Sequence, residues 1–168
     1  MFKKILLMVL MLAPVCAFAQ KVAHYNTEEI AKAYPAYLDA QKQLEDTQKQ
    51  YLNELQDMQK ELQTKYEKFQ AEIKETTPAN IRERREKELN DMQASIQDYY
   101  QKSQQDLEEL QAKLLQPVMA KFREAVEAVL KEGSFVYGID KSTVQGIAIN
   151  EALSTDVTAQ IKTKLGIK

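Results

Sequence analysis

The sequence predicts a mainly α-helical protein with a small β element, in which a long antiparallel helical hairpin stands on a small oligomerising β body. Residues 36–132 contain no glycine, and their only prolines are Pro78 and Pro117. Apolar residues on the two sides of Pro78 form pairs whose position numbers add up to a nearly constant value. Two antiparallel helices that pack against each other require this relation. The pairs are Tyr66 with Leu89, Leu62 with Met92, Met58 with Ile96, Leu55 with Tyr99, and Leu44 with Leu110.

Residues 1–19 have the features of a secretory signal peptide. Two lysines precede an apolar run at 5–13, and small residues before the expected cleavage point after Ala19 complete the pattern. The apolar run is far shorter than the ~20 residues of a membrane-spanning helix. Val15 stands directly before Cys16, where a lipidation motif has a small residue, so we do not expect a lipid anchor.

The composition of the mature chain leaves little for catalysis. Cleavage after Ala19 would remove the one cysteine, which excludes disulfides, thiol chemistry and cysteine-based metal sites. A lone histidine, His24, makes no metal site, and we interpret it as a packed or surface imidazole. We therefore expect no enzyme activity, cofactor or metal. Loss of the two leader lysines takes the formal net charge from −2 to −4, which disfavours nucleic acid as a partner.

The first part of the mature chain predicts a strand, a short helix and then a long helix. Residues 21–25 favour a strand, and Asn26 or Thr27 is a good helix N-cap. Pro35 should start a second helix, because proline is tolerated at the first helical position. The resulting hairpin arm covers 36–117 and has its tip near 76–80.

The apolar seam of the arm is long, thin and incomplete. Between Tyr51 and Ile73 the apolar steps of three and four residues repeat every eleven residues, which predicts a nearly straight or weakly right-handed helix. The roughly 40 residues from Pro35 to Thr77 predict an arm of about 60 Å. Tyr51 should face Ser103, and Thr47 or Gln48 should face Leu107. A well-filled coil has leucine at such positions, so we expect flexible arms, with a kink at Pro117.

After Gly133, which should end the helix, the apolar period changes from that of a helix to that of a strand. Phe135, Tyr137 and Ile139 share one face of the expected strand, and residues 145–150 form a second strand that we expect to be hairpinned to it. Ser154 or Thr155 should cap a last helix whose apolar face is Val157, Ile161 and Leu165.

Residues 20–35 and 118–168 make a body of only about 65 residues, which is marginal without partners. Oligomerisation through the body would cover its strand edges. The expected core of this oligomeric body is Val22, Phe135, Tyr137, Ile139, Ile147 and Ile149.

The mature chain as a whole resembles the Skp/OmpH family of periplasmic chaperones. The resemblance rests on residues 22–26 (VAHYN), the long hairpin rich in Gln, Lys and Glu, residues 133–140 (GSFVYGID) and residues 156–158 (DVT). It implies a jellyfish-like homotrimer whose three arms enclose a cavity on a shared β body. It also implies ATP-independent holding of unfolded outer-membrane proteins in the periplasm.

This chain departs from the strongly basic members of that family. Residues 36–116 hold 12 basic and 17 acidic residues. An acidic arm disfavours contact with membrane surfaces or lipopolysaccharide, and we expect neither.

Two groups of residues on the arm are candidates for contact with unfolded clients. Arg82, Arg84 and Arg85 lie beside the tip and could form a contact patch, although neighbouring glutamates could simply balance them. Phe69, Tyr99 and Tyr100 could offer apolar contacts, although helical spacing assigns most of the arm's aromatic residues to the seam. Since Tyr99 and Tyr100 are adjacent, one of them should face outward.

An alternative function is a structural or adaptor protein of the cell envelope, whose hairpin joins larger assemblies. Only about 16 mature residues precede the break at Pro35, whereas such adaptors insert their hairpin into β domains of substantial size. We therefore prefer the hypothesis that the protein is a holdase chaperone.

Overall fold

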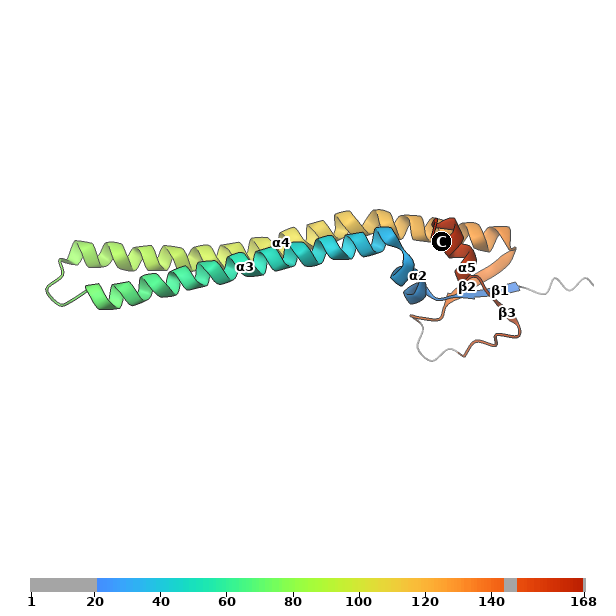
Figure 1. Cartoon of the computed structure of the whole chain (residues 1–168), viewed down its shortest axis with the longest axis horizontal. Helices are drawn as coiled ribbons and strands as arrows, with labels where there is room; N and C mark the ends of the chain where they lie inside the picture. The colour runs from blue at the N-terminus through green and yellow to red at the C-terminus, as the bar shows by residue number, and fades with distance from the viewer. Residues whose placement is uncertain (1–20, 144–147, 168) are drawn as a thin grey trace, which may run out of the picture.

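The computed structural model describes residues 21–143 and 148–167. Figure 1 shows two long helices, α3 and α4, which project as an arm from a body that contains the strands and the short helices. This arrangement confirms the mainly α fold with a helical arm on a small β body. The elements in chain order are β1 (Lys21–Tyr25), α2 (Thr27–Ala33), α3 (Pro35–Glu72), α4 (Ala79–Glu132), β2 (Phe135–Asp140), β3 (Ser154–Asp156) and α5 (Thr158–Lys164).

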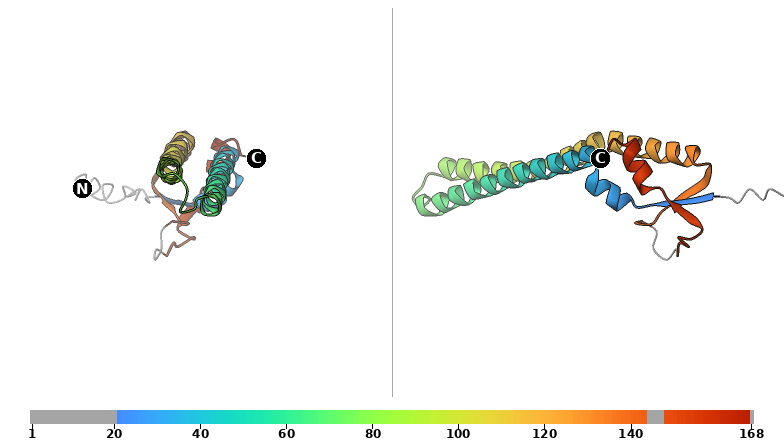
Figure 2. Two further views of the ribbon diagram at one scale, coloured as in Figure 1. Left: turned by 90° about the vertical axis from the view of Figure 1, so that its left-hand side faces the viewer. Right: turned by 45° about the vertical axis from the view of Figure 1, so that its right-hand side comes forward.

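Each of the first three helices begins at a residue suited to a helix start. Asn26 caps α2, since its side-chain oxygen accepts a hydrogen bond from the backbone N–H of Glu29. Pro35 is the first residue of α3, which has 38 residues and is therefore about 57 Å long. Pro78 is the N-cap residue of α4. In Figure 1 and in the right-hand view of Figure 2, α3 and α4 lie side by side along their length, and the left-hand view of Figure 2 shows the two helices end-on.

Helix α4 belongs to both the arm and the body. It runs for 54 residues and continues through Pro117, which cannot donate the usual hydrogen bond to the carbonyl of Lys113. Its last turns bring Phe122, Val126 and Val129 onto the body core. One continuous helix therefore carries the chain from the tip of the arm into the body.

The sheet has three parallel strands in the order β2-β1-β3. The predicted hairpin after β2 is therefore wrong, because parallel strands cannot be joined by a tight turn. Of the predicted second strand, 145–147 lie outside the described residues and 148–150 are not in a strand. The third strand is Ser154–Asp156 instead, and it pairs with the other edge of β1. Ile147 thus lies outside the described residues, while Ile149 is half-buried.

A bulge separates residues that the simple alternation placed on one face of β2. Lys21 pairs with Phe135 and Val22 pairs with Tyr137, so Val136 is an extra residue in β2. Phe135 packs against the protomer core, whereas Tyr137 is 51% exposed. The expectation that Phe135 and Tyr137 share a face is therefore wrong.

The body core lies between the sheet, the end of α4, and helices α2 and α5. Its buried members are Ala23, Ile30, Ala125, Val126, Val129, Val157 and Ile161. Val157 and Ile161 are almost fully buried, and Leu165 packs against them, which confirms the predicted apolar face of the last helix. The capping prediction is wrong: Ser154 and Thr155 belong to β3, and Asp156 accepts a hydrogen bond from the N–H of Thr158.

His24 is a packed residue of the central strand. Its side chain is buried, its Nδ1 shares a hydrogen bond with the hydroxyl of Ser154, and its Nε2 lies 3.6 Å from Oδ2 of Asp156. These contacts connect β1 to β3 through side chains as well as through the backbone.

Gly133 ends α4, as predicted, although it has an ordinary right-handed conformation. The residue with a left-handed backbone is Ser134, with φ of 53°. A Cβ atom on Gly133 would lie 2.0 Å from the ring of Phe135. Glycine is therefore required here for space, which allows the Phe135 ring to fold back against the helix end.

Two carboxylates hold the carboxyl ends of the strands. Asp140 accepts hydrogen bonds from the backbone N–H groups of Thr27 and Ser142. Burial acts to raise the pKa of both Asp140 and Asp156. At Asp140 the hydrogen bonds from Thr27 and Ser142 have a larger effect on the pKa than burial does. At Asp156 the hydrogen bonds from Thr158, together with nearby Lys141 and His24, have a larger effect than burial. Each pKa is consequently lowered below its ordinary value.

A carboxyl group whose pKa is lowered by folding stabilises the protein above its unfolded pKa of about 4, and this contribution is lost as the pH falls toward the folded pKa. We expect Asp140→Asn to lower the free energy of unfolding at pH 7 by about 1 kcal/mol, since the site is partly solvated. Its stability should also change less than that of the wild type between about pH 5 and pH 2. Urea unfolding across this range would measure both effects, with Asp57→Asn on the exposed arm surface as a control that changes neither.

Candidate functional site: the helical arm

The arm is the candidate functional surface because it is long and most of its side chains are exposed. Among residues 21–143 and 148–167, no group of three or more His, Cys, Asp or Glu side chains could hold a metal ion. No helix in these ranges is apolar enough over a sufficient length to cross a bilayer. The two packed helices of the arm have a long surface. The candidate site is therefore defined by the side chains that are exposed on this surface.

The middle of the arm is packed by aromatic rings. Tyr51 and Tyr99 meet edge to face, with ring centroids 6.2 Å apart. Ser103 is buried beside them, and its hydroxyl donates a hydrogen bond of 2.7 Å to the carbonyl of Tyr99. The hydroxyl of Tyr51 donates to Asp106, and the pKa of Tyr51 is raised by desolvation and by this carboxylate. The two tyrosines thus fill much of the space that leucines occupy in a regular coiled coil.

A small cavity of about 40 Å³ remains at this level of the arm. Gln48, Tyr51, Ser103 and Leu107 all line it, which agrees with the predicted opposition of Tyr51 to Ser103 and of Gln48 to Leu107. The serine hydroxyl bonds back to its own helix, a pattern that bends helices slightly. The seam is therefore least regular here.

Tyr99 and Tyr100 point in different directions, as their adjacency requires. Tyr99 lies in the seam, whereas Tyr100 is 52% exposed. Leu52, which lines the same cavity from the other helix, is also 52% exposed. The sequence reasoning named Tyr100 and missed Leu52, although the position of Leu52 directly after the seam residue Tyr51 was a usable signal. A role in contacting clients stays a prediction for Tyr100.

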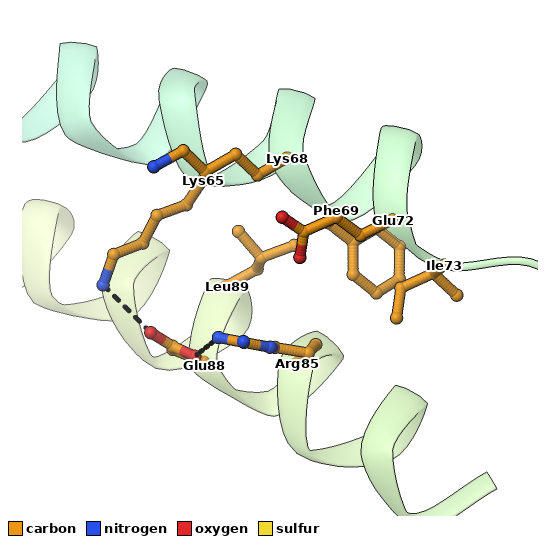
Figure 3. Close-up of a pocket in the computed structure, with 8 residues that line it drawn as sticks. All are labelled: Lys65, Lys68, Phe69, Glu72, Ile73, Arg85, Glu88 and Leu89. Atoms are coloured by element: carbon orange, nitrogen blue, oxygen red, sulfur yellow. Dashed lines mark hydrogen bonds and ion pairs between the residues drawn. The ribbon is translucent and has the colours of Figure 1, made fainter. Parts of the chain in front are cut away.

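A second groove of about 290 Å³ lies on the tip side of the arm. Figure 3 shows Phe69 and Leu89 between the two helices, with charged side chains at the rim. Glu88 accepts from Lys65 at 3.0 Å and from Arg85 at 3.3 Å. The hydrogen bond between Lys65 and Glu88 raises the pKa of the lysine and lowers that of the glutamate. Arg85 is therefore engaged within the arm, and Phe69 is a half-buried seam residue.

The three arginines near the tip have different surroundings. Arg82 is half-buried, and its Nη2 donates a hydrogen bond of 3.1 Å to the carbonyl of Lys74 in the tip turn. Arg84 is exposed, and in the described part of the chain it has no ion pair. Arg85 pairs with Glu88. The structure thus does not gather the three side chains at one place, and it gives Arg82 a contact that holds the tip.

We expect Arg82→Ala to loosen the tip, because the Lys74 carbonyl loses its charged donor. Amide hydrogen exchange across residues 73–82 should become about threefold to tenfold faster, as the loss of about one hydrogen bond implies. Arg84→Ala is the matched control, since it removes the same side chain two residues away without breaking a contact of the tip. Equal exchange in the two variants would contradict the structural role of Arg82.

Comparison with known proteins extends over nearly the whole described chain. The family model described as "Outer membrane protein (OmpH-like)" matches residues 21–165. The chaperone protein Skp of Pectobacterium atrosepticum is 28% identical over 144 residues, which cover 86% of this chain and 87% of that protein. A crystal structure of a putative outer membrane chaperone (OmpH-like) from Caulobacter crescentus superposes with a TM-score of 0.71 at 18% identity, covering 86% of this chain and 82% of that one.

The structural likeness supports the same fold, and the family match covers the β body at both ends as well as the whole arm. Together with the arm-on-body architecture, these findings confirm the resemblance noted in the sequence. The chain belongs to the OmpH-like outer membrane protein family, which includes the Skp chaperones.

Proposed function

We propose that this protein is an ATP-independent periplasmic holdase. In this proposal, three copies share a β body, and their arms enclose a cavity in which unfolded outer-membrane proteins are kept from aggregating. The signal peptide ending at Ala19 would deliver the chain to the periplasm. Family membership supports a chaperone role, and the arm itself suggests how that role is performed.

The proposal rests mainly on one observation: the arm is long, and few of its side chains are buried. The buried hydrophobic cluster lies in the body, and within the described part of the arm few side chains are fully buried. An arm of about 57 Å that contributes so little to a core presents mostly surface. Many weak contacts along such a surface can hold a mobile chain, because their combined avidity is high while each contact breaks easily.

Apolar side chains of the sheet that are exposed in the described chain support the proposed association between copies. Tyr137 and Val136 are 51% and 57% exposed, and Val22 and Ile139 are half-buried. Both outer strands of the sheet, β2 and β3, also have one edge unpaired in the described protomer. Exposed apolar side chains beside open strand edges favour association between copies.

The holdase proposal is tested by diluting a urea-unfolded outer-membrane β-barrel protein out of denaturant, without nucleotide, while light scattering is recorded. A few-fold molar excess of this protein should suppress most of the scattering, since aggregation requires free client chains. Serum albumin at equal mass is the control for nonspecific crowding. Full aggregation in the presence of a several-fold excess would rule the holdase role out.

The trimer is tested separately by sedimentation. The wild type should sediment as a trimer at micromolar concentration, and Tyr137→Asp should shift it toward monomer, because the new charge would be buried between copies. Tyr66→Asp, at a tyrosine of similar exposure on the arm, should leave the trimer intact. A wild-type monomer would contradict the shared body.

A further inference from the structure

The two flanks of helix α3 differ sharply in charge. One flank carries glutamines with two exposed apolar residues, Leu52 and Tyr66, which are 52% and 48% exposed. Tyr66, which the sequence paired with Leu89, therefore lies at the edge of the seam rather than inside it. At 100° per residue, these side chains lie in one row beside the seam. The row is Gln48, Leu52, Gln56, Gln59, Gln63 and Tyr66. It contains no charged residue, although 29% of the chain is charged.

Helix α4 has a matching row on the same side of the hairpin. Its members are Asn90, Gln93, Gln97, Tyr100 and Gln104. A groove and the small cavity place the rows side by side. The groove is lined by Gln59, Gln63 and Tyr66 together with Asn90 and Gln93, and Glu86 lines it at the end nearer the tip. The cavity is lined by Gln48 and Leu52 together with Tyr100 and Gln104. We call the two rows together the glutamine face.

The opposite flank of the hairpin carries the ion pairs. Lys65 bridges Glu61 and Glu88, and Lys102 pairs with Asp98. The charged groove of Figure 3 lies on this flank, since Lys65, Lys68 and Glu72 line it. Over residues 48–66 of α3 and 90–104 of α4, the arm therefore has a charged flank and an uncharged one, and Glu86 lies where the uncharged flank ends near the tip.

The amides of the glutamine face are available to a ligand. All members of both rows are exposed, and in the described chain only Gln63 among them has a side-chain hydrogen bond, to Glu67. A primary amide carries donors and an acceptor without charge, as a peptide group does. It can therefore pair with an unfolded backbone in either direction, and no charge has to be desolvated when it does so.

From Gln48 to Tyr66 the face is about 27 Å long, the span of about eight residues of extended chain. Leu52, Tyr66 and Tyr100 provide apolar contacts at separate points along it. A second folded copy fits this surface poorly, because a stable interface needs about 1,000 Å² or more with a continuous apolar centre. Here amides separate the apolar side chains.

We propose that the glutamine face is the surface on which each arm holds client protein, by binding extended, non-native polypeptide through its main-chain amides and its uncharged side chains. This inference rests on the proposed holdase function and adds to it the location and the chemistry of binding. The charged flank, which faces the other way, keeps the arm soluble.

The test compares two double variants that add the same charge to exposed glutamines. Gln59→Glu with Gln97→Glu places two carboxylates on the glutamine face, one on each helix. Gln50→Glu with Gln105→Glu places two outside the glutamine face on the same helices, and all four positions are exposed. Affinity for a fluorescently labelled, urea-unfolded outer-membrane β-barrel protein is measured after dilution, and circular dichroism checks that helix content is unchanged.

We expect the face variant to bind the probe about fivefold to tenfold more weakly, because a buried carboxylate would oppose the client backbone. The control variant should bind within about twofold of the wild type. Equal weakening in both variants would show that net charge alone matters, and no weakening in either would show that clients bind elsewhere. Either result overturns the inference.

The wild type separates this inference from the function on which it rests. If the wild type fails to bind the probe, the holdase function itself is wrong and the inference falls with it. If the wild type binds and the face variant binds equally well, only the inference is wrong. Sedimentation of both double variants gives one more outcome. If the face variant loses the oligomer and the control variant keeps it, the glutamine face is an interface between copies, and the proposal is overturned.

Discussion

The parallel pairing of β1 with β2 is the constraint on which the rest of the structure depends. Parallel neighbours require a crossover connection, usually a single helix. Here the connection runs from Thr27 to Ser134, and almost all of it is the arm. Asp140, the last residue of β2, accepts a hydrogen bond from the N–H of Thr27. This contact also connects the start of the crossover to the end of β2. The arm is thus part of an enlarged crossover connection, and the pairing of β1 with β2 holds the two ends of this connection together.

This constraint explains why α4 is so long. The helix must return from the tip, reach the body and cover the sheet before β2 can pair with β1. Its last turns do so with Val126 and Val129, which pack in the cluster with Ala23 of the central strand. β3 and α5 then close the other side, where Ile161 is fully buried. Backbone pairing between β1 and β2 ties the two ends of the connection together around this small core.

The arm is stabilised differently from the body. Its seam uses the edge-to-face pair of Tyr51 and Tyr99, a buried serine and surface ion pairs such as Lys65 with Glu88. Exposed ion pairs contribute little individually, so the arm can bend without losing a large part of its stability. Under the proposed holdase function, such an arm with one uncharged flank would suit a client that has no fixed shape, since contacts could be made and lost along its length.

The sequence by itself determined the helices, the turn at Pro78, the first helix cap and the seam, because these depend on neighbours within a few residues or on a simple antiparallel register. The two flanks of the arm are also readable from helical spacing once the seam is known. Only the tertiary structure decided the sheet. The bulge at Val136, the use of Ser154 as a strand residue and the parallel order around β1 arise from pairing between segments more than 100 residues apart. Local alternation of apolar residues carries no information about such partners, and the choice of partner decides which side of each strand is buried.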